Sequence, residues 1–405
     1  MKKRNLNNYN PFLQWINQIN SINYEQRIEG IHNFLCALQE NGTNGIRPYL
    51  SYCTITIKNL ILIFISDENL ENRRIAMRIL SILSNINDFN KFCENPKKQF
   101  GTSKMCLFNY LIDNNVLDFI FGLILNDDID VMNDSYAIIE LITRNSKNRC
   151  ELIYQRKIMN YFYQTPNGNF GGILYNIIYL LKIEITQEIQ KLLLSLLKSN
   201  NNHNIKYVLM IYKICLNNQK LVNDVLENID YIFNILTSKN PKIVIPALKL
   251  VSKLKVQSNE LLFAISLAIT TPGIIAPKKV ISILTKNFQK IVEINEPAIL
   301  DSIFQCLEES KFEVKIIVMK FLVNYAQYVN MVFDDYLYIV MNFLCDNQLV
   351  IYALNIILIM LEQYKIQGKK EDFYVIAREF NEQINNLLMS DDLEIVQLVE
   401  KIYDF

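Results

Sequence analysis

Lysine is the residue type whose spacing in this chain points most clearly to a chemical role. From Lys239 to Lys290 there are nine lysines and a single acidic residue, Glu260. Lys242, Lys249 and Lys253 recur at a spacing that puts them on one face of a helix. Such a stripe would bind an acidic, extended or helical segment of a partner protein through charge and neighbouring apolar contacts.

The sequence therefore predicts a basic groove as the binding site. The residues we assign to it are Lys242, Lys249, Lys253, Lys279, Lys286 and Lys315. The next stretch, Glu293–Glu313, is rich in acids, so the charge is locally asymmetric. A competing interpretation is that lysine is an ordinary residue of solvated helix faces, in which case the stripe has no function.

Side chains suited to catalysis or metal binding are few. The histidines are His32, expected at a surface or a satisfied interface, and His203, expected in a solvated polar turn. The eight cysteines are scattered without the paired spacing of zinc ligands. The acids of Asp127–Asp134 lack the glycine and closing glutamate of a calcium loop and are expected to cap a helix. We predict no catalytic residues, no metal and no cofactor.

The glycine-rich segment around Gly168, Gly171 and Gly172 resembles a phosphate-binding loop in composition alone. No Lys-Ser or Lys-Thr pair follows it, and no strand is expected before it. We predict a flexible connection between two helices there.

Composition adds further exclusions. The 41 basic and 41 acidic residues cancel, so net charge favours neither nucleic acid nor an anionic membrane. Apolar runs such as Leu60–Ile65 are far shorter than the roughly 20 residues that a transmembrane helix needs. The start at Met1 does not read as a secretory signal, and unpaired cysteines indicate a reducing compartment, the cytoplasm or the nucleus.

The elements that must position the lysines are repeated helices. In Asp230–Leu254 an apolar segment ends in a polar turn, and a second apolar segment of helical period follows with a small residue near its start. Aligning the copies gives these central residues: Ala76, Ala137, Val208, Ala247, Val280, Val318 and Ala353. The later steps, of about 33 to 43 residues, are those of two- or three-helix repeats that bury their apolar faces by stacking. The longer step from Ala137 to Val208 indicates one more, degenerate unit.

The block Leu236, Pro241, Ile243, Ala247 and Leu254, with its later echoes, resembles the armadillo/HEAT superfamily. The resemblance implies an all-α fold, a right-handed superhelical α-solenoid of armadillo/HEAT-like helical repeats. It also implies that the last helix of each repeat, and so the lysine stripe, lines a concave groove. Trp15 is the single tryptophan, so the Trp–Asn ladder of the cargo-receptor branch is missing.

We predict an N-terminal helical cap over residues 1–58, anchored by Trp15, and a repeat array over residues 59–405. Insertions are expected near residues 90–104 and 164–173. Asn240 and Pro241 should start a helix, in which Pro246 should cause a kink or a late start.

This architecture favours a non-enzymatic scaffold or adaptor that binds a partner protein along the groove. A regulatory subunit of a kinase, phosphatase or cytoskeletal assembly is the main alternative, and an enzyme on a solenoid is a weaker one. We expect no nucleic acid partner. The sequence leaves the partner's identity and the oligomeric state open.

Overall fold

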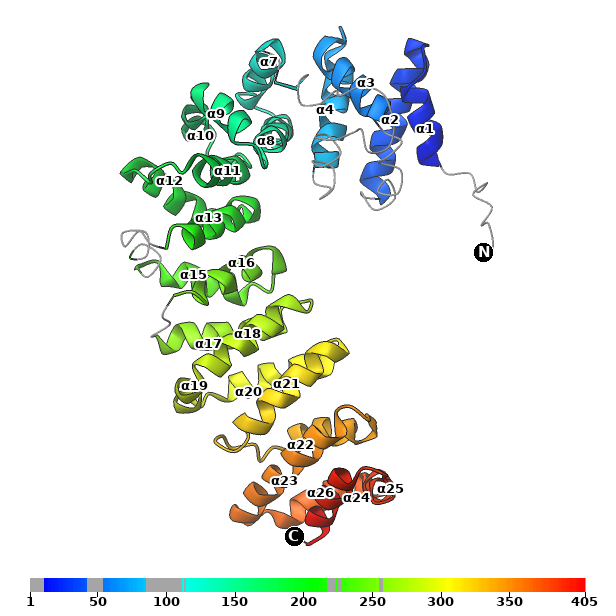
Figure 1. The fold of residues 1–405 in the computed structure, drawn as a ribbon, viewed down its shortest axis with the longest axis vertical. Coiled ribbons are helices and arrows are strands. Elements are labelled where there is room, and N and C mark those ends of the chain that lie inside the picture. Colours follow the sequence, from blue (N-terminus) through cyan, green and yellow to red (C-terminus); the bar gives the residue numbers. More distant parts are fainter. Residues whose placement is uncertain are drawn as a thin grey trace. The chain divides into compact units, whose positions relative to one another are not determined.

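The computed structural model describes residues 11–41, 54–84, 111–112, 114–216, 223, 227–254 and 258–404. In these ranges the regular structure is helical and contains no β-strand (Figure 1). The all-α class predicted from the sequence is therefore confirmed. The predicted insertion at residues 90–104 lies outside the described residues. Among the described helices, none combines the length and hydropathy that a bilayer crossing requires.

The chain divides into two compact units, Met1–Ile211 and Tyr212–Phe405. The described helices of the first unit are α1 (Pro11–Ile19), α2 (Tyr24–Asn41), α3 (Thr54–Ser66), α4 (Leu70–Ser84), α7 (Asn114–Ile124), α8 (Ile129–Thr143), α9 (Lys147–Gln155), α10 (Ile158–Gln164), α11 (Gly171–Leu181), α12 (Gln187–Leu197) and α13 (Asn202–Ile214), the last of which runs to the boundary.

Helix pairs stack in the first unit. α1 packs against α2 and α3 against α4, while α2, α4, α8 and α11 contact one another in succession. We call this succession, together with α13, the B row of the first unit. A helix pair cannot bury its own apolar face, so the next pair covers it. The predicted end of the cap, residue 58, falls inside α3.

The described helices of the second unit are α15 (Ile229–Thr237), α16 (Pro241–Val251), α17 (Asn259–Leu267), η3 (Ala268–Thr270), α18 (Ile275–Lys286), α19 (Phe288–Ile294), α20 (Pro297–Glu309), α21 (Phe312–Tyr325), α22 (Asp334–Met341), η4 (Asn342–Cys345), α23 (Val350–Ile366), α24 (Lys370–Glu379), α25 (Asn381–Leu387) and α26 (Leu393–Asp404).

Two parallel rows of helices build most of the second unit. The first helices of the pairs, α15, α17, α20 and α22, contact one another in succession and form the A row. The second helices, α16, α18, α21 and α23, do the same and form the B row (Figure 1). Each unit is thus an α-solenoid of paired helices, which confirms the predicted helical repeats.

The predicted central residues of the repeats lie where two helices approach closely. Six of them are completely buried: Ala76, Val208, Ala247, Val280, Val318 and Ala353. The exception is Ala137, which is half-exposed on α8. The degenerate unit expected between Ala137 and Val208 is present, because α11 packs against both α8 and α9.

The predicted helix starts are confirmed. Asn240 caps α16 by accepting a hydrogen bond from the backbone N–H of Lys242, and Pro241 is the first helical residue. Asp128 caps α8 by accepting from the N–H groups of Asp130 and Val131. The late start suggested for Pro246 is wrong, since α16 begins at Pro241 and continues through it.

The core between α1 and α2 differs in detail from the prediction. Phe12 and Phe34 are buried there with their rings edge to face, 6.0 Å apart, whereas Trp15 is only half-buried. Trp15 contacts Phe12 at 5.4 Å and so borders this core rather than anchoring it.

Candidate functional site

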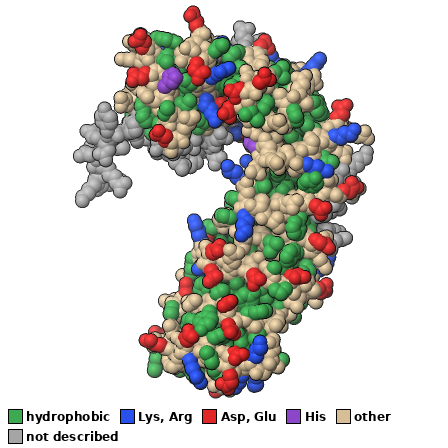
Figure 2. All heavy atoms as spheres, turned by 180° about the vertical axis from the view of Figure 1, so that it is seen from behind, with side chains coloured by type: hydrophobic (Ala, Val, Ile, Leu, Met, Phe, Trp, Pro, Cys, Tyr) green, Lys and Arg blue, Asp and Glu red, His purple; other side chains and the backbone are tan. Residues whose placement is uncertain are grey.

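The six predicted site residues all lie along the B row of the second unit. Lys242 and Lys249 are on α16, with Lys253 just beyond its end; Lys279 and Lys286 are on α18, and Lys315 is on α21. Lys242, Lys249, Lys253 and Lys286 are exposed, and the other two are half-buried. In Figure 2, basic side chains gather along the edge of this unit that the B row occupies.

One lysine of this surface was missed. Lys320 follows Val318 by two residues, as Lys249 follows Ala247, so extending the repeat alignment would have found it. Its Nζ lies 5.7 Å from the ring centroid of Tyr352, and the Nζ of Lys315 lies 5.1 Å from that of Phe343. Aromatic rings beneath both ammonium groups hold them in place. We call the six predicted lysines together with Lys320 the basic face.

Charge is separated between the two rows. The four B-row helices contain eight lysines and two acids: Lys242, Lys249, Lys278, Lys279, Lys286, Lys315, Lys320, Lys365, Glu313 and Glu362. The four A-row helices contain seven acids and neither lysine nor arginine: Asp230, Glu260, Asp301, Glu308, Glu309, Asp334 and Asp335. The second unit therefore presents a basic row beside an acidic row.

The helix dipole explains part of this pattern, because it favours acids in first turns and lysines in last turns, where Lys249 and Lys286 lie. Asp230, Glu260 and Asp334 lie in the first turns of their helices, where the helix dipole favours negative charge. Lys242 is also in a first turn, where the dipole disfavours it. Of the lysines on α16, α18 and α21, Lys278 pairs with Glu313 at 3.5 Å, but it is not part of the basic face.

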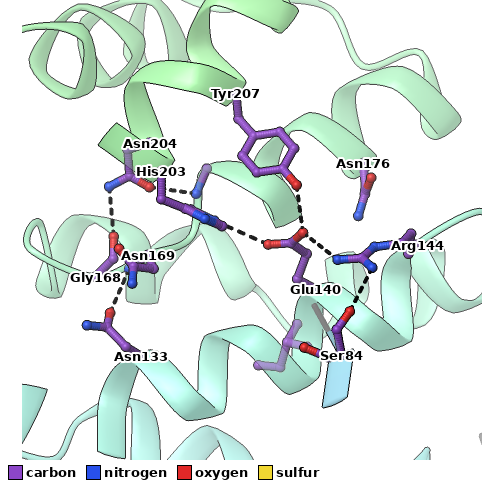
Figure 3. A network of polar contacts seen from close by, with 12 residues as sticks. Ser84, Asn133, Glu140, Arg144, Gly168, Asn169, Asn176, His203, Asn204 and Tyr207 are labelled. Carbon is purple, nitrogen blue, oxygen red and sulfur yellow. Dashed lines mark hydrogen bonds and ion pairs between the residues drawn. The ribbon is translucent and has the colours of Figure 1, made fainter. Parts of the chain in front are cut away.

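A second polar centre, absent from the sequence prediction, lies in the first unit (Figure 3). Glu140 of α8 is 5% exposed and accepts hydrogen bonds from Arg144 and from the hydroxyl of Tyr207, each at 2.8 Å. The Nε2 of His203 lies 3.2 Å from its other carboxylate oxygen. His203 and Tyr207 belong to α13, so one carboxylate joins two helices of the B row.

Two expectations from the sequence are wrong at this centre. His203 is not in a solvated turn but in the first turn of α13, with its ring against Glu140. The glycine-rich segment is a packed connection, in which Asn204 accepts from the N–H of Gly171 and donates to the carbonyl of Gly168, both at 2.8 Å. Phe170 beside them is completely buried.

Glycines at the start of α11 make this contact possible. A Cβ on Gly172 would lie 2.2 Å from the carboxylate of Glu140, and one on Gly171 would lie 2.9 Å from the Cα of Asn204. Because α11 carries no side chain at these two positions, groups from α8 and α13 meet across it. The contact joins residues 67 positions apart, which local sequence pattern does not encode.

We expect Gly172→Ala to destabilise the protein, although alanine has a higher helix propensity than glycine. The added methyl group must displace the buried Glu140 carboxylate, at a cost of about 1–3 kcal/mol. The matched control is Gly122→Ala on α7, where a Cβ meets nothing within 4 Å and the change should stabilise by up to about 1 kcal/mol. Urea denaturation of both variants checks the two signs. Equal effects at the two positions would contradict the arrangement.

The ionisation of Glu140 reflects its partners. Burial by itself raises the pKa of Glu140, but His203, Arg144 and Tyr207 outweigh burial and lower the pKa to about 2, from 4.5. Burial and the nearby Glu140 raise the pKa of Tyr207, so its phenol stays protonated as a donor. Asp134 on α8 shows the opposite balance, since burial raises its pKa despite Ser81 and the Arg78 guanidinium at 2.7 Å.

This balance predicts a pH dependence of stability. A carboxyl group whose pKa falls on folding stabilises the native state above its unfolded pKa, and that stabilisation is lost as pH falls through the folded value. The stability difference between wild type and Glu140→Gln should therefore be present at pH 5 and shrink between pH 4.5 and 2. Urea denaturation of both proteins across this range measures it. A difference that stays the same down to pH 2 would contradict the assignment.

A polar cavity of about 240 Å³ adjoins this centre. Its lining includes Arg78, Asn133, Ala137, Asn169 and His203. Among the described residues, no group of three or more His, Cys, Asp or Glu side chains is arranged to hold a metal ion.

Comparisons with known proteins identify no family. No protein-family model matches the chain, and no curated protein matches it. Solved structures with a similar arrangement include an engineered protein, 13% identical over 98% of each chain with a TM-score of 0.43. Another is the karyopherin Kap121p bound to the SUMO protease Ulp1p, 13% identical with a TM-score of 0.45. That match covers 97% of this chain and 52% of the karyopherin, so the chain spans about half its length. The fold assignment rests on the helix packing described above.

Proposed function

We propose that this protein is a non-enzymatic binding scaffold whose basic face takes up an acidic segment of a partner protein. The separation of charge between the two rows of the second unit is the observation that carries the proposal. A general excess of lysine would have placed bases on both rows. Here the A-row helices α15, α17, α20 and α22 carry no lysine, whereas the B-row helices α16, α18 and α21 carry seven.

The placement of Lys242 supports a role in binding rather than in folding. This lysine opposes the dipole of α16 and is exposed, so its removal would favour the folded state. A residue that lowers stability at an exposed position is more easily explained by contact with a ligand. The rings beneath Lys315 and Lys320 also reduce the side-chain entropy that binding must overcome.

A protein segment fits this face better than nucleic acid does. The B-row helices of the second unit contain no arginine. Arginine is the side chain that forms bidentate hydrogen bonds with phosphate groups. Tyr352 and Phe343 lie beneath lysines and are not arranged for bases to stack on them. The two-helix pairs of the second unit also lead us to propose a HEAT-like rather than a three-helix armadillo repeat.

The polar centre of the first unit does not favour an enzyme. The carboxylate of Glu140 is occupied by Arg144, Tyr207 and His203, and a pKa of about 2 makes it a weak base. We interpret the Glu140 carboxylate as a structural contact that holds α8 and α13 together.

Lys242→Glu tests the proposal, because it separates binding from stability. The variant should gain roughly 0.3–1 kcal/mol of unfolding free energy from the helix dipole and yet bind a fluorescent polyglutamate peptide several-fold more weakly. Fluorescence anisotropy and urea denaturation measure the two quantities. The control is Lys401→Glu in the last turn of α26, which should leave peptide binding unchanged. Unchanged binding by Lys242→Glu, or no binding by wild type, would contradict the proposal that the basic face binds an acidic segment.

A further inference from the structure

The cavity beside Glu140 is built from side chains whose orientation the hydrogen bonds settle. The backbone N–H of His203 donates to the Oδ1 of Asn201, at 3.0 Å. The Nδ2 of Asn201 therefore donates to the Oδ1 of Asn169, at 2.7 Å. The N–H of Asn169 in turn donates to the Oδ1 of Asn133, at 2.9 Å (Figure 3). Backbone donors at both ends leave no freedom to flip these amides.

Several nitrogen donors at this cavity have hydrogen-bonding capacity left over. Asn133 and Asn169 each use their oxygen, and in the described part of the chain neither Nδ2 has a partner. Arg78 uses one of its five N–H groups, for Asp134, and Arg144 uses two, for Glu140 and the carbonyl of Ser84. The buried acceptors, the carboxylates of Asp134 and Glu140, are already engaged.

A cavity with several spare nitrogen donors suits a ligand that has acceptors only. The two guanidinium groups balance the two buried carboxylates, so a bound anion meets no excess of negative charge. The volume of about 240 Å³ admits a small group rather than a folded segment. Hydrogen bonds from charged donors to such a group are the stronger kind.

We propose that this cavity of the first unit binds a small oxyanion, a carboxylate or a phosphate group. This site is separate from the basic face and does not depend on the function proposed for that face. The anion is supplied either as a free small molecule or as the acidic side chain of a bound partner.

Two variants remove the site without breaking its ion pairs. Ala137→Met fills the cavity from α8 with a side chain that makes no polar contact. Asn133→Asp keeps the oxygen that accepts from Asn169 but replaces the spare donor with negative charge. Circular dichroism and the melting temperature without ligand establish that both variants fold. Lys249→Glu/Lys253→Glu/Lys286→Glu serves as the control for anions bound at the basic face.

The experiment is a thermal unfolding titration of the full chain at constant ionic strength. The probes are inorganic phosphate, malonate and N-acetylglutamate amide, whose one carboxylate represents a partner's side chain. Wild type and the lysine control should show a saturable rise in melting temperature. Both cavity variants should need about tenfold to a hundredfold more ligand. A rise with N-acetylglutamate amide alone assigns the anion to a partner, and a rise with phosphate or malonate alone assigns it to a free molecule. No saturable rise in wild type, or an unweakened rise in either cavity variant, would overturn the proposal.

Discussion

Glu140→Ala should lower the free energy of unfolding by about 3–5 kcal/mol, because it removes a buried carboxylate and leaves its three half-buried partners without the group that they share. Arg144, His203 and Tyr207 all lose the group that holds α8 and α13 together across the two glycines of α11. Urea denaturation followed by circular dichroism measures the loss. The fluorescence of Trp15, the single tryptophan, reports on the first unit in the same experiment.

The matched control for this variant is Glu151→Ala, which removes an exposed carboxylate from the adjacent helix α9. Its effect should stay within about 0.5 kcal/mol, as for most surface positions. If Glu140→Ala lowered the free energy of unfolding no more than Glu151→Ala, the buried carboxylate would not hold α8 and α13 together. A double mutant, Glu140→Ala/Gly172→Ala, refines the result. Once the carboxylate is gone, the methyl group at residue 172 has nothing to displace, and its cost should disappear.

Lys249→Glu/Lys253→Glu/Lys286→Glu should weaken binding of the polyglutamate peptide about a hundredfold. Each reversal replaces an attraction with a repulsion at an exposed position, for roughly 1 kcal/mol per residue. The three side chains lie on or just beyond α16 and α18 and take no part in the core. Helicity by circular dichroism should therefore match that of wild type.

The control for net charge reverses three exposed lysines elsewhere, Lys147, Lys191 and Lys401. This variant changes the total charge by the same amount but leaves the basic face intact. Its affinity for the peptide should stay within about threefold of wild type, because distant exposed charges are screened by salt. Equal losses in the two triple variants would mean that net charge, and not the basic face, governs binding.

The parts of the structure that follow from periodicity could be predicted from the sequence. Ala247, Val280, Val318 and Ala353 recur at helical-repeat spacing, and each is buried where two helices pack. The same spacing predicted where the lysines of the stripe lie, on or just beyond consecutive second helices of the repeats, but their role in binding stays a prediction. The assignment of Ala137 failed because a longer step separates it from the neighbouring repeats and leaves its register poorly defined.

The Glu140 centre could not be predicted, because it depends on residues that are distant in the sequence. Glu140 looks like one more acid in a helix, and His203 lies in a polar run that resembles a turn. The two meet only because Gly171 and Gly172 leave space at the start of α11. The same glycines suggested flexibility when considered alone. Close approach in three dimensions, and not turn geometry, explains why glycine occupies these positions.

Hydrogen exchange of the full chain, with and without the polyglutamate peptide, tests the central proposal most directly. Binding at the basic face should slow exchange in segments that contain α16, α18 and α21, and leave α24, α25 and α26 unchanged. The exchange of α8 and α13 should also stay the same, unless the peptide places a carboxylate in the cavity beside Glu140. Peptide binding with protection confined to helices outside the B row of the second unit would contradict the proposal.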